Sequence, residues 1–133
     1  MVGKEARLAL HWRIDSKVRL VTVTAAGFVT AVEFAELVDA VLGAGAIGYA
    51  KLFDGSAEDL RITREDLLVI GANLRSWHSH PDVGPLAIVL APRKHDAAAR
   101  LLGILAAAPR PMRLFTSRPP AERWIAGPVE RRS

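Results

Sequence analysis

Two histidines flank a serine in the segment His78-Ser79-His80-Pro81. Histidines separated by one residue in an extended loop can share a zinc ion, and this segment matches the core of a zinc isopeptidase motif of the JAMM type. That motif also needs a serine and an aspartate downstream, where Ile88 and Ala91 stand. A third ligand would have to come from Asp82 or a distant histidine. We therefore predict that the segment is a hydrated loop and that the protein binds no metal or other cofactor.

Other catalytic patterns are missing from the sequence. The chain has no cysteine, so it has no thiolate nucleophile, and it has no Gly-x-Ser-x-Gly elbow. The segment Gly43-Ala44-Gly45-Ala46-Ile47-Gly48 spells a dinucleotide fingerprint, but it follows a predicted helix instead of opening one. It is typical of a turn from a helix to a strand. We predict that the protein is not an enzyme.

Charged and hydroxyl side chains gather between positions 54 and 64. The apolar residues before them indicate a buried strand that ends at Asp54, and Thr63 with Asp66 three residues later predicts the start of a capped helix. In α/β sheets, ligands and partners meet the loops at the carboxyl ends of the strands. We therefore expect an interaction surface for a protein partner, formed by Asp54, Ser56, Glu58, Asp59, Arg61, Thr63 and Arg64.

The elements that must position this loop follow from the periodicity of apolar residues. A chain of 133 residues predicts one domain, residues 1–133, and half of the residues are hydrophobic. Alternating apolar residues predict a hairpin of two strands over 8–14 and 19–24. Further strands are expected over 49–54, 85–91 and 112–116, and helices over 30–42, 63–77, 96–105 and after Ser117. The fold class is α/β, a mixed five-stranded sheet with about four helices in the order β-β-α-β-α-β-α-β-α.

Two of the predicted helices have clear signals at their starts and on their inner faces. Thr30 and Glu33 form a capping box, and Phe34, Leu37, Val38, Val41 and Leu42 then share one face. In the helix that follows Thr63, the predicted inner stripe contains Leu67, Ile70, Leu74 and Trp77. The run Leu86-Ala87-Ile88-Val89-Leu90 is typical of a strand that is buried on both faces.

The order of elements and several apolar segments resemble the STAS-type domains. The segments are Gly27-x-Val29-Thr30, Leu52-Phe53-Asp54, Pro85-x-Ala87-Ile88-Val89 and Arg110-Pro111-Met112-Arg113-Leu114-Phe115. The chain is most similar to the SpoIIAA-like branch, which is related in fold to anti-sigma-factor antagonists. This resemblance covers nearly the whole chain. It implies a STAS-like fold and a non-catalytic regulatory or protein-interaction module of unknown partner.

In members of that family, a partner kinase phosphorylates a serine at the start of the helix after the central strand. The corresponding residues here are Ile62-Thr63-Arg64-Glu65, in which Arg64 takes the place of the phosphoacceptor and Glu65 that of a glycine. Thr63 keeps a hydroxyl, and Ser56 is an exposed hydroxyl in the preceding loop. These two residues are the candidate phosphoacceptors. For Thr63, an ordinary role as a helix N-cap is the better supported interpretation.

Lipid-binding proteins related to this family imply an alternative function. The side chains of Tyr49, Phe53 and Trp77, with Gly71 and Ala72, could line a cavity for a small apolar or lipid-like ligand. The same residues could instead pack the core. The alternative prediction is therefore a binder or sensor of a small apolar ligand.

Charge and hydropathy limit the remaining partners. The net charge is +4, and residues 100–133 hold seven arginines and two glutamates. These arginines have no interleaved aromatic residues and no nucleic-acid motif, so we predict no specific nucleic-acid binding. No segment approaches about eighteen uninterrupted apolar residues, so we predict no membrane span and a cytoplasmic protein. Trp12 on the opening hairpin could offer a sheet edge to a second copy, as in a homodimer.

Overall fold

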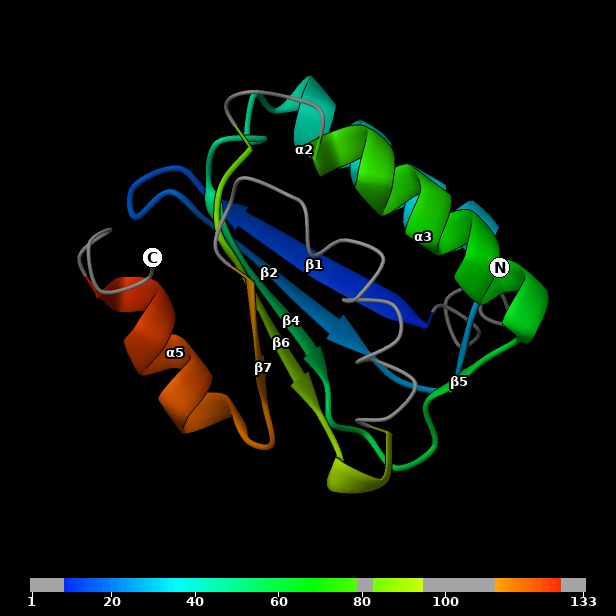
Figure 1. The fold of residues 1–133 in the computed structure, drawn as a ribbon. Coiled ribbons are helices and arrows are strands. Elements are labelled where there is room, and N and C mark those ends of the chain that lie inside the picture. The colour runs from blue at the N-terminus through cyan, green and yellow to red at the C-terminus, as the bar shows by residue number, and fades with distance from the viewer. Residues whose placement is uncertain (1–8, 79–82, 95–111, 128–133) are drawn as a thin grey trace, which may run out of the picture.

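The structure is a computed structural model that describes residues 9–78, 83–94 and 112–127 (Figure 1). Its elements along the chain are β1 (Leu10–Asp15), β2 (Leu20–Ala25), β3 (Phe28–Val29), α2 (Ala31–Gly43), β4 (Ala50–Gly55), β5 (Arg61–Ile62), α3 (Arg64–His78), β6 (Leu86–Leu90), the 3₁₀ turn η1 (Pro92–Lys94), β7 (Met112–Phe115) and α5 (Arg118–Ala126). The predicted helix over 96–105 lies outside the described residues.

The main sheet has five strands in the order β1-β2-β4-β6-β7. β1 pairs antiparallel with β2, and the other neighbours are parallel. The sequence prediction of a mixed five-stranded sheet with an opening hairpin is thus confirmed. β4, the strand that ends near Asp54, is the middle strand. β1 forms one edge of the sheet and exposes Trp12, but pairing with a second copy stays a prediction.

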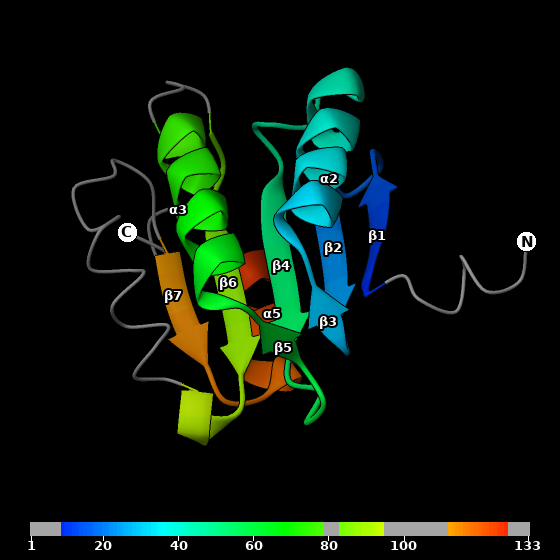
Figure 2. The same cartoon turned by 90° about the vertical axis from the view of Figure 1, so that its right-hand side faces the viewer.

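Helices cover both faces of this sheet. α2 and α3 lie on one face and α5 lies on the other (Figures 1 and 2). The core has two corresponding parts. The cluster beneath α5 contains the buried residues Leu52, Ala87, Val89, Ala121 and Ile125. The larger cluster includes Val21, Val23, Phe34, Leu37, Val41, Tyr49 and Ile70. Four successive residues of β6 are buried, as the unbroken apolar run predicted.

The start of α2 confirms half of the predicted capping box. The Thr30 hydroxyl accepts a hydrogen bond from the Glu33 N–H at 3.2 Å. The Glu33 carboxylate, however, accepts hydrogen bonds from the backbone N–H groups of Ala9 at 2.8 Å and Leu10 at 3.3 Å. One carboxylate therefore joins α2 to the start of the edge strand, which a reading of local sequence could not show.

The predicted inner face of α2 was wrong at one position. Phe34, Leu37 and Val41 are buried, but Leu42 is 50% exposed. Leu42 lies in the last turn of the helix, beside the surface turn at Gly45. Its side chain is therefore exposed, although that of the preceding residue, Val41, is buried. Gly45 has φ +66°, a left-handed conformation that glycine adopts without strain.

The described part of α3 fits its predicted stripe. Ile70 is buried and Leu67 is half-buried, whereas Leu68 and Val69 are exposed. The side chains of Leu74 and Trp77 lie outside the described residues. α5 begins after Ser117, as predicted, and buries Ile125 before it ends at Ala126.

At the amino-terminal end of β4, hydrogen bonds to backbone carbonyl oxygens hold neighbouring segments close together. Lys51 is only 3% exposed, and its Nζ donates to the carbonyl oxygens of Ile47 at 2.6 Å and Tyr49 at 2.9 Å. The N–H of Gly84, just before β6, also donates to the Ile47 oxygen, at 3.0 Å. These contacts join the α2–β4 turn to the start of β6.

Candidate functional site

The site is built from the loops at the carboxyl ends of β4 and β6. Asp54 is the next-to-last residue of β4, and its side chain is only 13% exposed. One carboxylate oxygen, Oδ1, accepts hydrogen bonds from the Ser56 N–H at 3.0 Å and the Ser56 hydroxyl at 2.6 Å. The other oxygen, Oδ2, lies 3.5 Å from Nη1 of Arg118 on α5. Asp54 therefore shapes the turn after β4 and joins it to the helix on the opposite face from α3.

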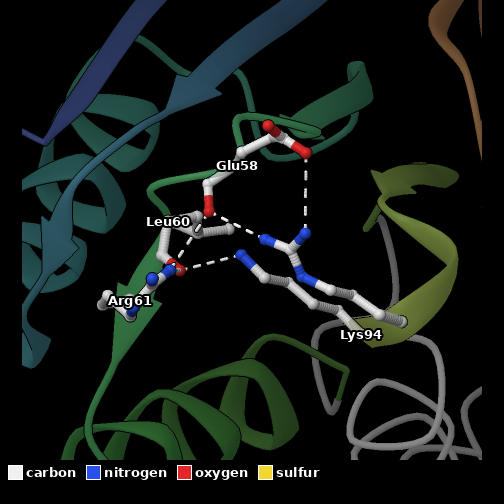
Figure 3. A network of polar contacts seen from close by, with 5 residues as sticks. Glu58, Leu60, Arg61 and Lys94 are labelled. Carbon is white, nitrogen blue, oxygen red and sulfur yellow. Dashed lines mark hydrogen bonds and ion pairs between the residues drawn. The ribbon is translucent and has the colours of Figure 1, made fainter.

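The next part of this loop is held by β6 and its 3₁₀ turn. The Glu58 carbonyl oxygen accepts hydrogen bonds from Arg93 Nη2 at 2.8 Å and from Arg61 Nη1 at 3.1 Å. The Leu60 carbonyl oxygen accepts from Lys94 Nζ at 2.8 Å and from Arg61 Nη1 at 2.9 Å. Figure 3 shows these contacts converging on the two carbonyl groups. The loop is thus fixed by side chains that come from two directions.

A short second sheet fixes the end of the loop. β5 pairs in parallel with β3, with Phe28 opposite Arg61 and Val29 opposite Ile62. The Arg61 N–H also donates to the Gly27 carbonyl at 2.7 Å. The loops that follow β2 and β4 consequently lie side by side. The sequence did not predict this sheet, because strands of two residues are too short to show any periodicity.

α3 begins with the predicted cap. The Thr63 hydroxyl accepts a hydrogen bond from the Asp66 N–H at 3.0 Å, and both Thr63 and Arg64 are exposed. Glu65 and Asp66 follow in the first turn, where negative charge interacts favourably with the helix dipole. The helix start therefore presents a hydroxyl, a cation and acidic groups within one turn.

Replacing Thr63 with alanine should lower the free energy of unfolding by about 1 kcal/mol, because the Asp66 N–H loses its acceptor. Urea denaturation followed by circular dichroism would measure the change. Thr63→Ser is the matched control, since it keeps the oxygen, and it should stay within about 0.5 kcal/mol of the native chain. If the native protein and Thr63→Ala were equally stable, Thr63 would not act as a stabilising N-cap of α3.

Positive charge predominates where the loop meets η1. The pKa of the Lys94 ammonium is lowered by its partial burial, and further by the nearby Arg93 and Arg61 guanidinium groups. Asp59 and Glu58 raise it, but they offset only part of these effects. The sequence analysis missed Arg93 and Lys94. The sequence did contain a signal for them, because these two consecutive cations come shortly after the apolar run that predicted β6.

The structure divides the predicted interaction surface into two parts. Asp54 and Ser56 bind each other, and Asp54 also contacts α5. The other five predicted residues lie on the loop, β5 and the start of α3, and their surface is exposed; they are Glu58, Asp59, Arg61, Thr63 and Arg64. Asp54 was grouped with the exposed residues because a charge at a strand end usually faces water, but its pairing with Arg118 depends on tertiary structure.

The structure describes only some of the residues considered for metal or apolar ligands, and the side chain of Trp77 lies outside the described residues. His78 ends α3, and His80 lies outside the described residues. Within residues 9–78, 83–94 and 112–127, no cluster of three or more histidine, cysteine or acidic residues could hold a metal. Tyr49 and Phe53 pack in the larger core cluster, whereas Ala72 is exposed. Nor does any helix in the described ranges have the length and apolar character to cross a membrane.

Comparison with solved structures identifies the architecture. The chain is similar to an anti-sigma factor antagonist from Mycobacterium paratuberculosis, with a TM-score of 0.55 over 89% of this chain and 95% of that chain. The chain has the STAS-type fold. The two sequences are 16% identical, so this likeness concerns the STAS-type fold and not a shared activity. No protein-family model matches the sequence, and no curated protein matches it.

Proposed function

We propose that this STAS-type domain is a cytoplasmic, non-catalytic regulatory module. In this proposal it binds a protein partner through the docking surface, defined as Ser56, Glu58, Asp59, Arg61, Thr63, Arg64 and Glu65. The observation that carries the proposal is a loop that is anchored along its length and yet exposes charged and hydroxyl side chains. A loop already held in one conformation loses little entropy on binding, which favours affinity.

Several anchors of the docking surface use backbone atoms, so the charged side chains of Glu58, Asp59 and Arg64 stay available to a partner. The Arg61 guanidinium is itself one of the anchors. Glu58 and Leu60 are held through their carbonyl oxygens, and Arg61 is held through its N–H in the small sheet. The side chain of Glu58 is 90% exposed, and Asp59 and Arg64 are also exposed. Loops positioned by a rigid scaffold commonly carry binding residues.

The docking surface carries charges of both signs. Glu58, Asp59 and Glu65 are acidic, whereas Arg61 and Arg64 are basic. Charges of both signs select a partner whose charges are complementary, because like charges repel. Complementary charges also raise the rate of association. The STAS-type protein to which the chain is similar is named an anti-sigma factor antagonist, and that regulatory name supports a regulatory role here.

Modification of either candidate phosphoacceptor would alter this surface. A phosphoryl group on Ser56 would place negative charge beside Asp54 and break their 2.6 Å hydrogen bond. A phosphoryl group on Thr63 would disturb the cap of α3 next to Glu65 and Asp66. These local effects support the idea that modification at Ser56 or Thr63 regulates partner binding.

A charge exchange tests the docking surface. The double variant Asp59→Arg with Arg64→Glu keeps the net charge but reverses both signs on the surface. We expect it to reduce capture of specific partners from a cell lysate by about tenfold or more, because like charges would then face each other. Quantitative mass spectrometry of proteins retained by the tagged domain would measure the loss.

The matched control exchanges charges elsewhere. Asp39→Arg with Arg123→Glu alters exposed residues of α2 and α5 and also keeps the net charge. It should capture the same partners as the native domain. The proposal fails if the Asp59/Arg64 exchange leaves capture unchanged while circular dichroism shows that all three proteins are folded.

A further inference from the structure

Three cations from two separate segments converge at the docking surface, to which one of them, Arg61, belongs. Arg61 belongs to β5, and Arg93 and Lys94 belong to η1, which directly follows β6. All three donate hydrogen bonds to the carbonyl oxygens of Glu58 or Leu60 (Figure 3). The fold thus brings together positive groups that are more than thirty positions apart in the chain.

These cations keep donors that the carbonyl groups do not use. An ammonium has three N–H bonds and a guanidinium has five. Lys94 uses one with Leu60, Arg61 donates through Nη1, and Arg93 donates through Nη2. Within the described part of the chain, the remaining partner of these three side chains is the carboxylate of Glu58. Several donors are therefore available to an added anion.

The Glu58 carboxylate neutralises the cluster weakly. Its Oε1 lies 3.6 Å from Arg93 Nη1, which is longer than a hydrogen bond, and the side chain is 90% exposed. An exposed ion pair of this kind contributes little to stability, so another anion can readily displace the carboxylate. Asp59, the other nearby acid, is also exposed. Burial is the largest cause of the lowered pKa of Lys94, and the nearby Arg93 and Arg61 guanidinium groups lower this pKa further.

The position of the cluster in the sheet favours ligand binding. β4 and β6 are adjacent parallel strands, and the cluster lies where their carboxyl ends are followed by loops. In open α/β sheets, ligands bind outside the carboxyl ends of the strands. A phosphate group matches the donors, since its oxygens can accept from two guanidinium groups and one ammonium at once.

We propose that Arg61, Arg93 and Lys94 form a binding site for a phosphate group, which replaces the Glu58 carboxylate. The ligand class is a phosphate ester, carried either by a small molecule or by a phosphorylated side chain of another protein. This site goes beyond the proposed function, because it does not depend on the charges of Asp59 and Arg64. It assigns Glu58 a distinct role as an internal competitor for the same donors.

Titration of the full chain with inorganic phosphate tests the site. Backbone amide NMR signals of residues 58–61 and 93–94 should shift and saturate, with sodium chloride at equal ionic strength as the reference. Arg93→Gln should weaken binding about tenfold, because it removes a charge-assisted pair of donors. Glu58→Gln should tighten binding about threefold, because the competing charge is gone. Arg123→Gln, on the exposed face of α5, is the control and should change nothing.

The direction of the Glu58 effect separates a binding site from a purely structural network. If the cations only hold the loop, Glu58→Gln will not tighten phosphate binding. That result, or a lack of saturation at about 10 mM phosphate, would overturn the proposal. A second titration distinguishes the two sources. Tighter binding of adenosine diphosphate than of inorganic phosphate would assign the site to small molecules, and tighter binding of a phosphoserine peptide would assign it to phosphorylated proteins.

Discussion

Replacing Gly84 with alanine should reduce the free energy of unfolding by about 4 kcal/mol or more, a large part of the stability of a typical domain. A Cβ atom at Gly84 would lie 2.2 Å from the Tyr49 carbonyl oxygen and 2.6 Å from that of Gly48. Both obstacles are backbone atoms, so no side-chain rotation can relieve the overlap. The chain would have to separate the start of β6 from the α2–β4 turn and lose the Gly84 to Ile47 hydrogen bond.

Chemical denaturation followed by circular dichroism would measure this effect. Gly43→Ala is the matched control, because a Cβ atom there would meet no heavy atom within 4 Å. Gly43 is the last residue of α2, so alanine should be neutral or stabilise the protein by up to about 1 kcal/mol. If Gly84→Ala unfolds at the same denaturant concentration as the native chain, the backbone at Gly84 does not lie as close to that of Gly48 and Tyr49 as the structure places it.

Replacing Leu52 with alanine should cost about 2–5 kcal/mol. Leu52 lies in the middle strand, is only 1% exposed and belongs to the core cluster beneath α5. Two of its neighbours in that cluster, Ala87 and Ala121, are already small and fully buried, so they cannot move to fill the vacated space. Most of the cavity should therefore persist, which favours the upper part of the range.

Thermal and urea unfolding of the purified variant would test this value. Leu42→Ala makes the same chemical change at a residue that is 50% exposed, and it should alter stability by less than about 0.5 kcal/mol. The difference between the two leucines measures what burial adds. Similar losses at both positions would mean that Leu52 does not lie in a packed core.

Local sequence signals predicted most of the fold. The caps at Thr30 and Thr63 depend on residues three positions apart, so the sequence contains all of the information. The buried strand β6 follows from a continuous apolar run, which needs no knowledge of the partners that cover it. The STAS-type fold, predicted from resemblance, is confirmed by the structural comparison.

Long-range contacts account for what the sequence analysis missed. The carboxylate of Glu33 binds the start of β1 instead of its own cap, over a separation of more than twenty residues. Asp54 pairs with Arg118, and the loop carbonyl groups accept hydrogen bonds from Arg93 and Lys94 in η1, the turn after the next strand of the sheet. Each of these polar contacts requires the folded chain to bring distant segments together. A pattern within one segment could not indicate them.

The closed packing at Lys51 and Gly84 has a consequence for how this scaffold can diverge. The backbone is locked at the amino-terminal end of β4, the opposite end of the strand from the docking surface, so this part of the central strands is held together by contacts that do not involve residues 56–59. Evolution, or a protein engineer, can therefore exchange that short stretch for others of similar length. The scaffold would persist while the choice of partner changed.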